Sequence, residues 1–165
     1  QVNNQWKSYP IGFSQTETIG TAGCAITSAN MILMAKSPWV CATPSLVNSW
    51  LKSNQGYDTA MCSYCLKWAK PTEMDGVPSG LNWKGFGTLP STPAGLKSKI
   101  DSGRFIIARS TRWTPKPHWV VIRGYTGTGQ YWWDFSYWDP SDSSPTFRWV
   151  NDSYVVPGCE TREYD

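Results

Sequence analysis

The stretch that decides the fold is Gly23-Cys24-Ala25-Ile26-Thr27-Ser28, because a helical pattern begins at its cysteine. Apolar side chains recur over residues 24–36 with the period of a helix, and Ser37-Pro38 ends the pattern. The amino end of a helix carries unpaired amides and a positive dipole end, which favour the attacking thiolate form of a cysteine. Cys24 is therefore a candidate nucleophile, and Gly23 would permit an unusual backbone angle and a close substrate approach. The alternative is a buried structural cysteine.

A cysteine nucleophile needs a base, and the chain offers one imidazole, His118, at the start of the strand pattern over residues 119–125. A second strand pattern covers residues 130–138, after the turn Thr126-Gly-Thr-Gly129. If Tyr125 pairs with Tyr131, His118 falls opposite Trp138 and next to Asp139. A carboxylate there would steady the imidazolium, so Asp139 is the candidate third residue; an ordinary Asp-Pro turn is the alternative reading.

The order of the patterns predicts an α+β fold in a single domain spanning residues 1–165. Helices are expected over residues 24–36, 43–52 and 93–102, and residues 54–92 are expected to be mostly loop. Strands are expected at residues 105–109, 119–125, 130–138 and 147–150. We therefore expect N-terminal helices packed on a C-terminal antiparallel sheet.

Composition narrows the possible functions. A net charge of +3 with scattered basic residues argues against nucleic-acid binding, and no apolar run approaches the roughly 20 residues of a membrane span. Six of the 11 Trp residues lie between residues 113 and 149. They are expected to fill a core and stiffen strands, or in part to line a groove that stacks on sugar or peptide.

Five cysteines suggest two disulfides and one remaining thiol, which the helix start assigns to Cys24. The disulfide candidates are Cys41, Cys62, Cys65 and Cys159, whose connectivity the sequence leaves open. A zinc site at Cys62-Ser-Tyr-Cys65 lacks a second close pair, so we expect no metal and no cofactor. Disulfides imply an oxidising compartment, and we expect a secreted, extracellular protein.

Several segments together resemble the bacteriocin-processing (double-glycine) peptidase-like cysteine peptidases. Residues 23–31 are similar to that family's Gly-Cys-Gly-Pro-Thr-Ser-x-Ala-Met, although Ala25-Ile26 replaces Gly-Pro. Thr18-Ile19-Gly20 resembles its lead-in, residues 1–6 its Gln-x-Asp-x-Arg-Trp, residues 118–124 its His strand, and Asp139-Pro140 its Asp-Pro pair. The resemblance implies a papain-like fold, a triad of Cys24, His118 and Asp139, and a glutamine amide in the oxyanion hole. Gln1 fits that glutamine by motif, and Gln15 is its rival.

The expected activity is that of a cysteine peptidase or amide hydrolase acting on a peptide or a cell-wall (peptidoglycan) peptide, as a monomer. Two alternatives stay open. One is a catalytically inactive papain-fold module that binds glycan or peptide in a Trp-rich groove. The other is an acyl or peptidyl transferase that uses the same cysteine and histidine.

Overall fold

The computed structural model describes residues 1–37, 42–74, 76, 80–111, 117–142 and 148–165. Contacts divide the chain into two compact units. The first unit comprises Gln1–Trp83 with Pro140–Ser143, and the second comprises Lys84–Asp139 with Ser144–Asp165. That these units form one peptidase domain over residues 1–165 stays a prediction.

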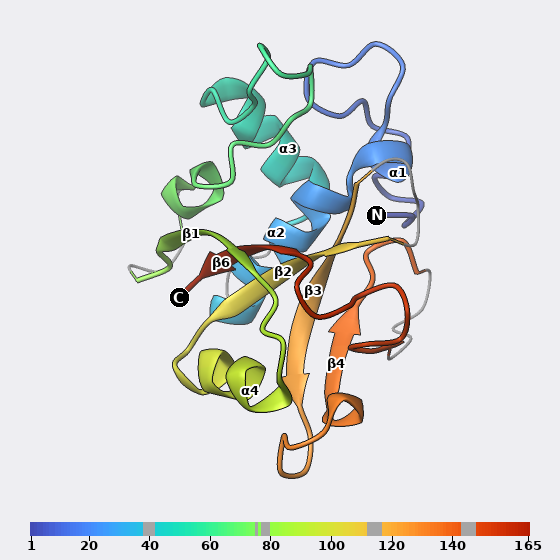
Figure 1. Ribbon diagram of the computed structural model, residues 1–165. Helices are drawn as coiled ribbons and strands as arrows, with labels where there is room; N and C mark the ends of the chain where they lie inside the picture. The colour runs from blue at the N-terminus through green and yellow to red at the C-terminus, as the bar shows by residue number, and fades with distance from the viewer. Residues whose placement is uncertain (38–41, 75, 77–79, 112–116, 143–147) are drawn as a thin grey trace. The chain divides into compact units, whose positions relative to one another are not determined.

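The first unit is helical, with α1 Ile19–Ala22, α2 Cys24–Lys36, α3 Pro44–Ser53 and the 3-10 helix η1 Lys70–Glu73. Thr18 caps α1 and Thr43 caps α3, where Pro44 occupies the first turn. The central helix α2 is buried around most of its circumference and contacts both α3 and η1 (Figure 1). The two helices predicted in this half of the chain are therefore confirmed.

A buried amide, that of Asn48 on α3, fastens the leading segment of the chain to this helical unit. Its Oδ1 accepts hydrogen bonds from the Gly12 amide at 2.8 Å and from the Tyr57 hydroxyl at 2.6 Å. Its Nδ2 donates to the Pro10 carbonyl at 3.1 Å. Burial raises the pKa of Tyr57, so its hydroxyl keeps the proton that it donates. One side chain thus satisfies three groups from two loops.

The second unit is built on a six-stranded sheet in the order β1-β6-β2-β3-β4-β5 (Figure 1). Its strands are β1 Trp83–Thr88, β2 Phe105–Ser110, β3 His118–Tyr125, β4 Phe135–Trp138, β5 Arg148–Trp149 and β6 Glu160–Tyr164. Helix α4, Pro93–Asp101, contributes Leu96 to a core that includes Ile106 and Val120. The α+β class is confirmed. Among the described helices, none is long and apolar enough to span a membrane.

Two strands were missed by the sequence analysis. β1 lies within residues 54–92, which were predicted to be mostly loop, and β6 was not predicted at all. β1 contains two glycines, and β6 reads Glu-Thr-Arg-Glu-Tyr, which has little of the apolar alternation that identifies a strand. Their place in the sheet therefore comes from pairing with neighbours. Of the strand predicted over residues 147–150, the structure has Arg148–Trp149, and Phe147 lies outside the described residues.

The predicted register of the β3–β4 hairpin is wrong. Tyr125 pairs with Phe135 rather than Tyr131, and Val121 pairs with Trp138, with a bulge between Ile122 and Gly124. Residues 126–134 form a longer loop containing the 3-10 helix η2, Trp132–Asp134. The Asp134 carboxylate closes that loop by accepting hydrogen bonds from the backbone amides of residues 130 and 131. A local side-chain bond of this kind competes with strand pairing.

The Asn48 amide generates a stability prediction. Asn48→Ala leaves buried donors on Gly12 and Tyr57 without their acceptor, so we expect the free energy of unfolding to fall by about 2–4 kcal/mol. Denaturant titration measures the change. The matched control, Asn54→Ala, loses one part-buried bond to the Trp50 carbonyl and should cost less than about 1 kcal/mol. Equal losses in the two variants would contradict the anchoring role of Asn48.

Candidate active site

Cys24 is the first residue of α2, and its side chain is buried. It carries a thiol outside any disulfide. Gly23 is the N-cap of the helix, so no side chain caps the first turn, and that turn contains no acidic residue. The amide ends of the first turn and the positive end of the helix dipole therefore act at the residue that bears the sulfur.

Gly23 is required for space and not for an unusual backbone angle, which corrects the sequence interpretation. Its φ of −85° and ψ of 13° are accessible to any residue. A Cβ at this position would lie 2.4 Å from the Ile19 carbonyl oxygen, to which the Gly23 amide is also hydrogen-bonded at 2.9 Å. The glycine lets α1 run into α2 without a gap and so fixes Cys24 at the helix start.

The two candidate oxyanion glutamines lie in different surroundings within the first unit. The Gln1 Nε2 donates to the Gly20 carbonyl at 2.9 Å, and the Gln1 backbone nitrogen donates to the Pro140 carbonyl at 2.7 Å. Gly20 belongs to α1, the helix that leads directly into Cys24. Gln15 is exposed on the loop between Pro10 and Thr18. The structure thus holds the Gln1 amide against the helix that precedes the cysteine and leaves Gln15 facing solvent.

The second unit brings together His118 and Asp139. His118 is the first residue of β3, Asp139 directly follows β4, and the His118 Nε2 lies 2.7 Å from the Asp139 Oδ1. The two side chains are 5% and 0% exposed. Continuing the observed register by one residue places Asp139 opposite Val120, which is on the same face of the strand as His118. The contact is therefore diagonal across the hairpin.

This contact decides the roles of the two ring nitrogens. A neutral imidazole donates from one nitrogen and accepts at the other. With Nε2 directed at the carboxylate, Nδ1 is the nitrogen that can take a proton from a nucleophile. A buried carboxylate also stabilises the imidazolium that results. Asp134, the other acidic residue of this hairpin, is occupied by the backbone amides of its own loop.

The surroundings of His118 within the second unit include residues that the sequence analysis did not assign to a site. Ser110, at the end of β2, is the Cα partner of His118. Arg109 next to it faces Glu160 of β6, and Arg162 of β6 stacks on the ring of Trp119 at 4.5 Å. No sequence signal could have found this group, because it depends on β6, the strand that the pattern did not reveal.

The structure treats the four predicted disulfide cysteines differently. Cys62 and Cys65 are joined to each other, and Cys41 lies outside the described residues. Cys159 is a thiol in the structure, which corrects the expectation that it forms a disulfide. Burial raises its pKa to about 11. Within the described part of the chain, no group of three His, Cys, Asp or Glu side chains is arranged to hold a metal ion.

Comparison with known proteins identifies the family of the chain. The model of the Peptidase_C39 like family matches residues 3–156, which is most of the chain and includes both Cys24 and the His118–Asp139 pair. A search of curated proteins found no match. The helices of the first unit and the antiparallel sheet of the second fit the papain-like fold of such peptidases. The chain belongs to the Peptidase_C39 like family of cysteine peptidases.

Proposed function

We propose that the protein is a thiol-dependent amide hydrolase, in which Cys24 is the nucleophile, His118 the general base and Asp139 the residue that orients the imidazole. The observation that carries the proposal is the buried 2.7 Å contact between His118 and Asp139. A histidine that is held by a carboxylate and directs its second nitrogen elsewhere has the chemistry of a general base. Family membership supports pairing that base with Cys24.

The reaction would follow from these groups. His118 Nδ1 takes the thiol proton, and the Cys24 sulfur attacks the carbonyl carbon of the scissile amide to give a tetrahedral oxyanion. The imidazolium, steadied by Asp139, then gives its proton to the leaving amine as the carbon–nitrogen bond breaks. Water, deprotonated by His118, hydrolyses the resulting thioester and restores the thiol.

The oxyanion would be held by the Cys24 backbone amide and the side-chain amide of Gln1. The position of Gln1 against Gly20 supports it over Gln15, which is exposed. A primary amide has two N–H groups, so a bond to the Gly20 carbonyl uses one and the second can serve the oxyanion.

The proposed substrates are peptides or the peptide part of peptidoglycan, and the proposed location is outside the cell. The disulfide between Cys62 and Cys65 supports an oxidising compartment, because such bonds are rare in reducing ones. The proposed working form is a monomer.

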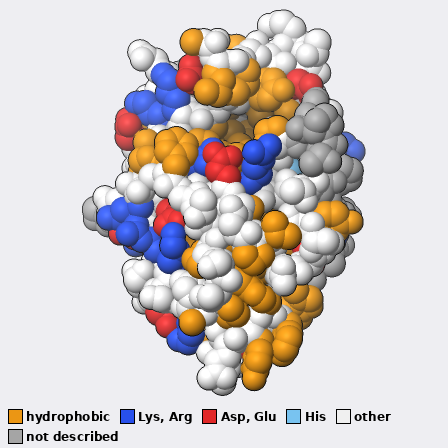
Figure 2. Space-filling model, viewed as in Figure 1, with side chains coloured by type: hydrophobic (Ala, Val, Ile, Leu, Met, Phe, Trp, Pro, Cys, Tyr) orange, Lys and Arg blue, Asp and Glu red, His pale blue; other side chains and the backbone are white. Residues whose placement is uncertain are grey.

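A second candidate function, binding of glycan or peptide, is favoured by one specific observation. The rings of Tyr131 and Trp133 stack at 4.6 Å and 7° in the loop of the β3–β4 hairpin, and 50% and 64% of these residues is exposed. Figure 2 shows hydrophobic side chains gathered over the end of this hairpin. Exposed stacked rings suit carbohydrate or peptide faces. Binding of this kind would not depend on the Cys24 thiol, and this distinguishes it from the hydrolase.

The hydrolase proposal predicts that Cys24→Ala abolishes amide hydrolysis and leaves the melting temperature nearly unchanged, since one sulfur atom is removed from a helix start. The measurement is cleavage of a peptide library that includes peptidoglycan fragments, read by mass spectrometry. Met34→Ala, an exposed change on the same helix, is the control and should retain hydrolysis. Undiminished hydrolysis by Cys24→Ala would exclude Cys24 as the nucleophile.

The proposed base predicts a selective effect on alkylation. With iodoacetamide at pH 7, Cys24 should be labelled faster than Cys159, because a pKa of about 11 leaves Cys159 less than about 1% thiolate below pH 9. His118→Ala should slow labelling of Cys24 by about tenfold and move its rate profile to higher pH. Cys159 is the internal reference, whose rate should rise about tenfold per pH unit in both proteins. If the Cys24 profile does not respond to His118→Ala, the dyad is refuted.

A further inference from the structure

Asp152 lies in the segment that leads from β5 to β6, and its carboxylate accepts three hydrogen bonds. Oδ1 accepts from the backbone amides of Tyr154 at 3.0 Å and Val155 at 3.2 Å. Oδ2 accepts from the Tyr137 hydroxyl of β4 at 2.6 Å. Burial and the nearby carboxylate raise the pKa of Tyr137, so its hydroxyl keeps the proton that it donates. One side chain therefore ties this segment to strand β4.

The same segment crosses the strands that carry the proposed base. The sheet order places β2, β3 and β4 between β5 and β6, so the chain that joins β5 to β6 has to cross all three (Figure 1). Val150 and Val155 of this segment are buried in the same core as Val120. Val120 lies on the face of β3 that carries His118, because the two residues are two positions apart on one strand. The segment therefore packs on that face of the sheet.

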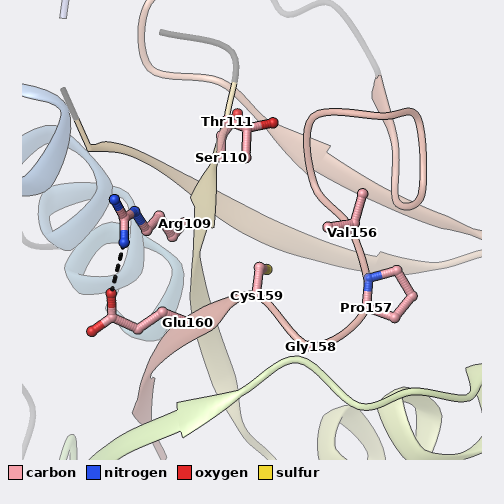
Figure 3. A pocket seen from close by; sticks show the side chains of 8 residues that line it. All are labelled: Arg109, Ser110, Thr111, Val156, Pro157, Gly158, Cys159 and Glu160. Carbon is pink, nitrogen blue, oxygen red and sulfur yellow. Dashed lines mark ion pairs between the residues drawn. The ribbon is translucent and has the colours of Figure 1, made fainter. Parts of the chain in front are cut away.

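The crossing segment also bonds to the end of β2. Strands β2 and β6 are paired as far as Ala108, and beyond it the end of β2 and residues 156–160 line a pocket of about 370 Å³ (Figure 3). The Thr111 amide donates to the Tyr154 carbonyl at 2.9 Å, and the Thr111 hydroxyl donates to the Ser153 carbonyl at 3.3 Å. These bonds hold the end of β2 where its pairing with β6 has stopped.

Both neighbours of β3 are thus held close to the proposed catalytic pair. On one side, Thr111 directly follows Ser110, the Cα partner of His118. On the other side, Tyr137 precedes Asp139 by two residues, so the two lie on the same face of the sheet. The ladder between β3 and β4 ends before it reaches His118. Strand pairing alone therefore does not fix the distance between the imidazole and the carboxylate.

The backbone on either side of Asp152 is strained. Asn151 and Ser153 have φ angles of 70° and 78°, in the left-handed region. Such a conformation costs free energy for residues other than glycine and persists where surrounding bonds impose it. Those bonds include the three of the Asp152 carboxylate and one from the Asn151 amide to the Val155 carbonyl at 2.6 Å. Loss of the carboxylate should therefore let the segment relax to another conformation.

We propose that Asp152 is a positioning residue, which keeps His118 and Asp139 in their hydrogen-bonded geometry by tying β4 and the end of β2 to one crossing segment. The inference rests on the proposed function, since it names what keeps the proposed base in place. Asp152 acts through Tyr137 and Thr111 and takes no part in bond breaking.

The test uses the fact that His118 is the only histidine of the chain, so isotope-labelled histidine gives the NMR signals of one imidazole. The Nε2 proton of this ring is directed at the Asp139 carboxylate and should exchange slowly with water in the wild type, because both side chains are buried. Asp152→Ala should speed this exchange about tenfold at a temperature where circular dichroism shows folded protein. It should also lower kcat about tenfold with little change in KM, since the base is misplaced while substrate binding is kept.

Two further variants separate positioning from general stability. Asp152→Asn keeps the Oδ1 acceptor for the two amides and turns its Nδ2 to the tyrosine oxygen, so it should restore slow exchange. Asp101→Ala is the matched control, because Asp101 accepts the Tyr125 hydroxyl at 2.7 Å at the opposite end of β3. It should leave the His118 proton unchanged. If Asp152→Ala does not fold, Tyr137→Phe replaces it and should speed the exchange to a smaller extent.

Fast exchange in Asp152→Ala that Asp152→Asn reverses supports the inference, whether or not a cleaved peptide has been found. An unchanged His118 proton in folded Asp152→Ala, or in Tyr137→Phe in its place, overturns the inference and leaves the hydrolase proposal standing. Equal acceleration in Asp101→Ala also overturns it, because the effect would then follow from lost stability alone. Free exchange of this proton in the wild type would instead contradict the buried pair, and with it the proposed base.

Discussion

The buried contact between His118 and Asp139 is the constraint on which the proposed site in the second unit depends. A carboxylate with no exposed surface must be paired, since an isolated buried charge costs several kcal/mol or more. The pairing requires one particular register of β3 against β4, because a slip of one residue would turn Asp139 to the other face of the sheet. The bulge between Ile122 and Gly124 and the loop closed by Asp134 set that register. The far end of the hairpin therefore determines which acid faces the histidine.

The nucleophile depends on a different constraint, namely the close approach of backbone segments around α1. A Cβ on Gly20 would lie 2.8 Å from the Lys7 carbonyl oxygen, and one on Gly23 would lie 2.4 Å from that of Ile19. Two glycines thus let the leading segment, α1 and the start of α2 pack without intervening side chains. Because α2 is buried along most of its length, the sulfur is carried by a rigid element, as a catalytic group requires.

The described cysteines lie in different environments, and these environments give them different chemical states. Cys24 is the first residue of a helix, where backbone amides have no partner within the helix. Cys159 lies in a partly buried wall, where desolvation raises the pKa of the thiol to about 11 and keeps it protonated. Cys62 and Cys65 are three residues apart and joined in a turn of the first unit.

The sequence by itself determined the features that are encoded locally. The helical period after Cys24, the N-cap at Thr43 and the apolar runs of β2 and β3 are encoded in consecutive residues. The α+β class and the candidate residues could therefore be predicted. Because the sequence contains one histidine, His118 could likewise be predicted as the imidazole base.

Tertiary structure alone decided the partners of these residues. The His118–Asp139 contact was anticipated from a register that proved wrong, and it is made across the hairpin diagonal because a bulge and a longer loop shift the strands. Strand β6, the assignment of Gln1 to Gly20 and the pocket beside Arg109 depend on contacts between distant segments. The periodicity of the sequence indicates which face of a helix or strand a residue occupies. The neighbours that its side chain contacts are determined by strand pairing and packing, which exist only in the folded chain.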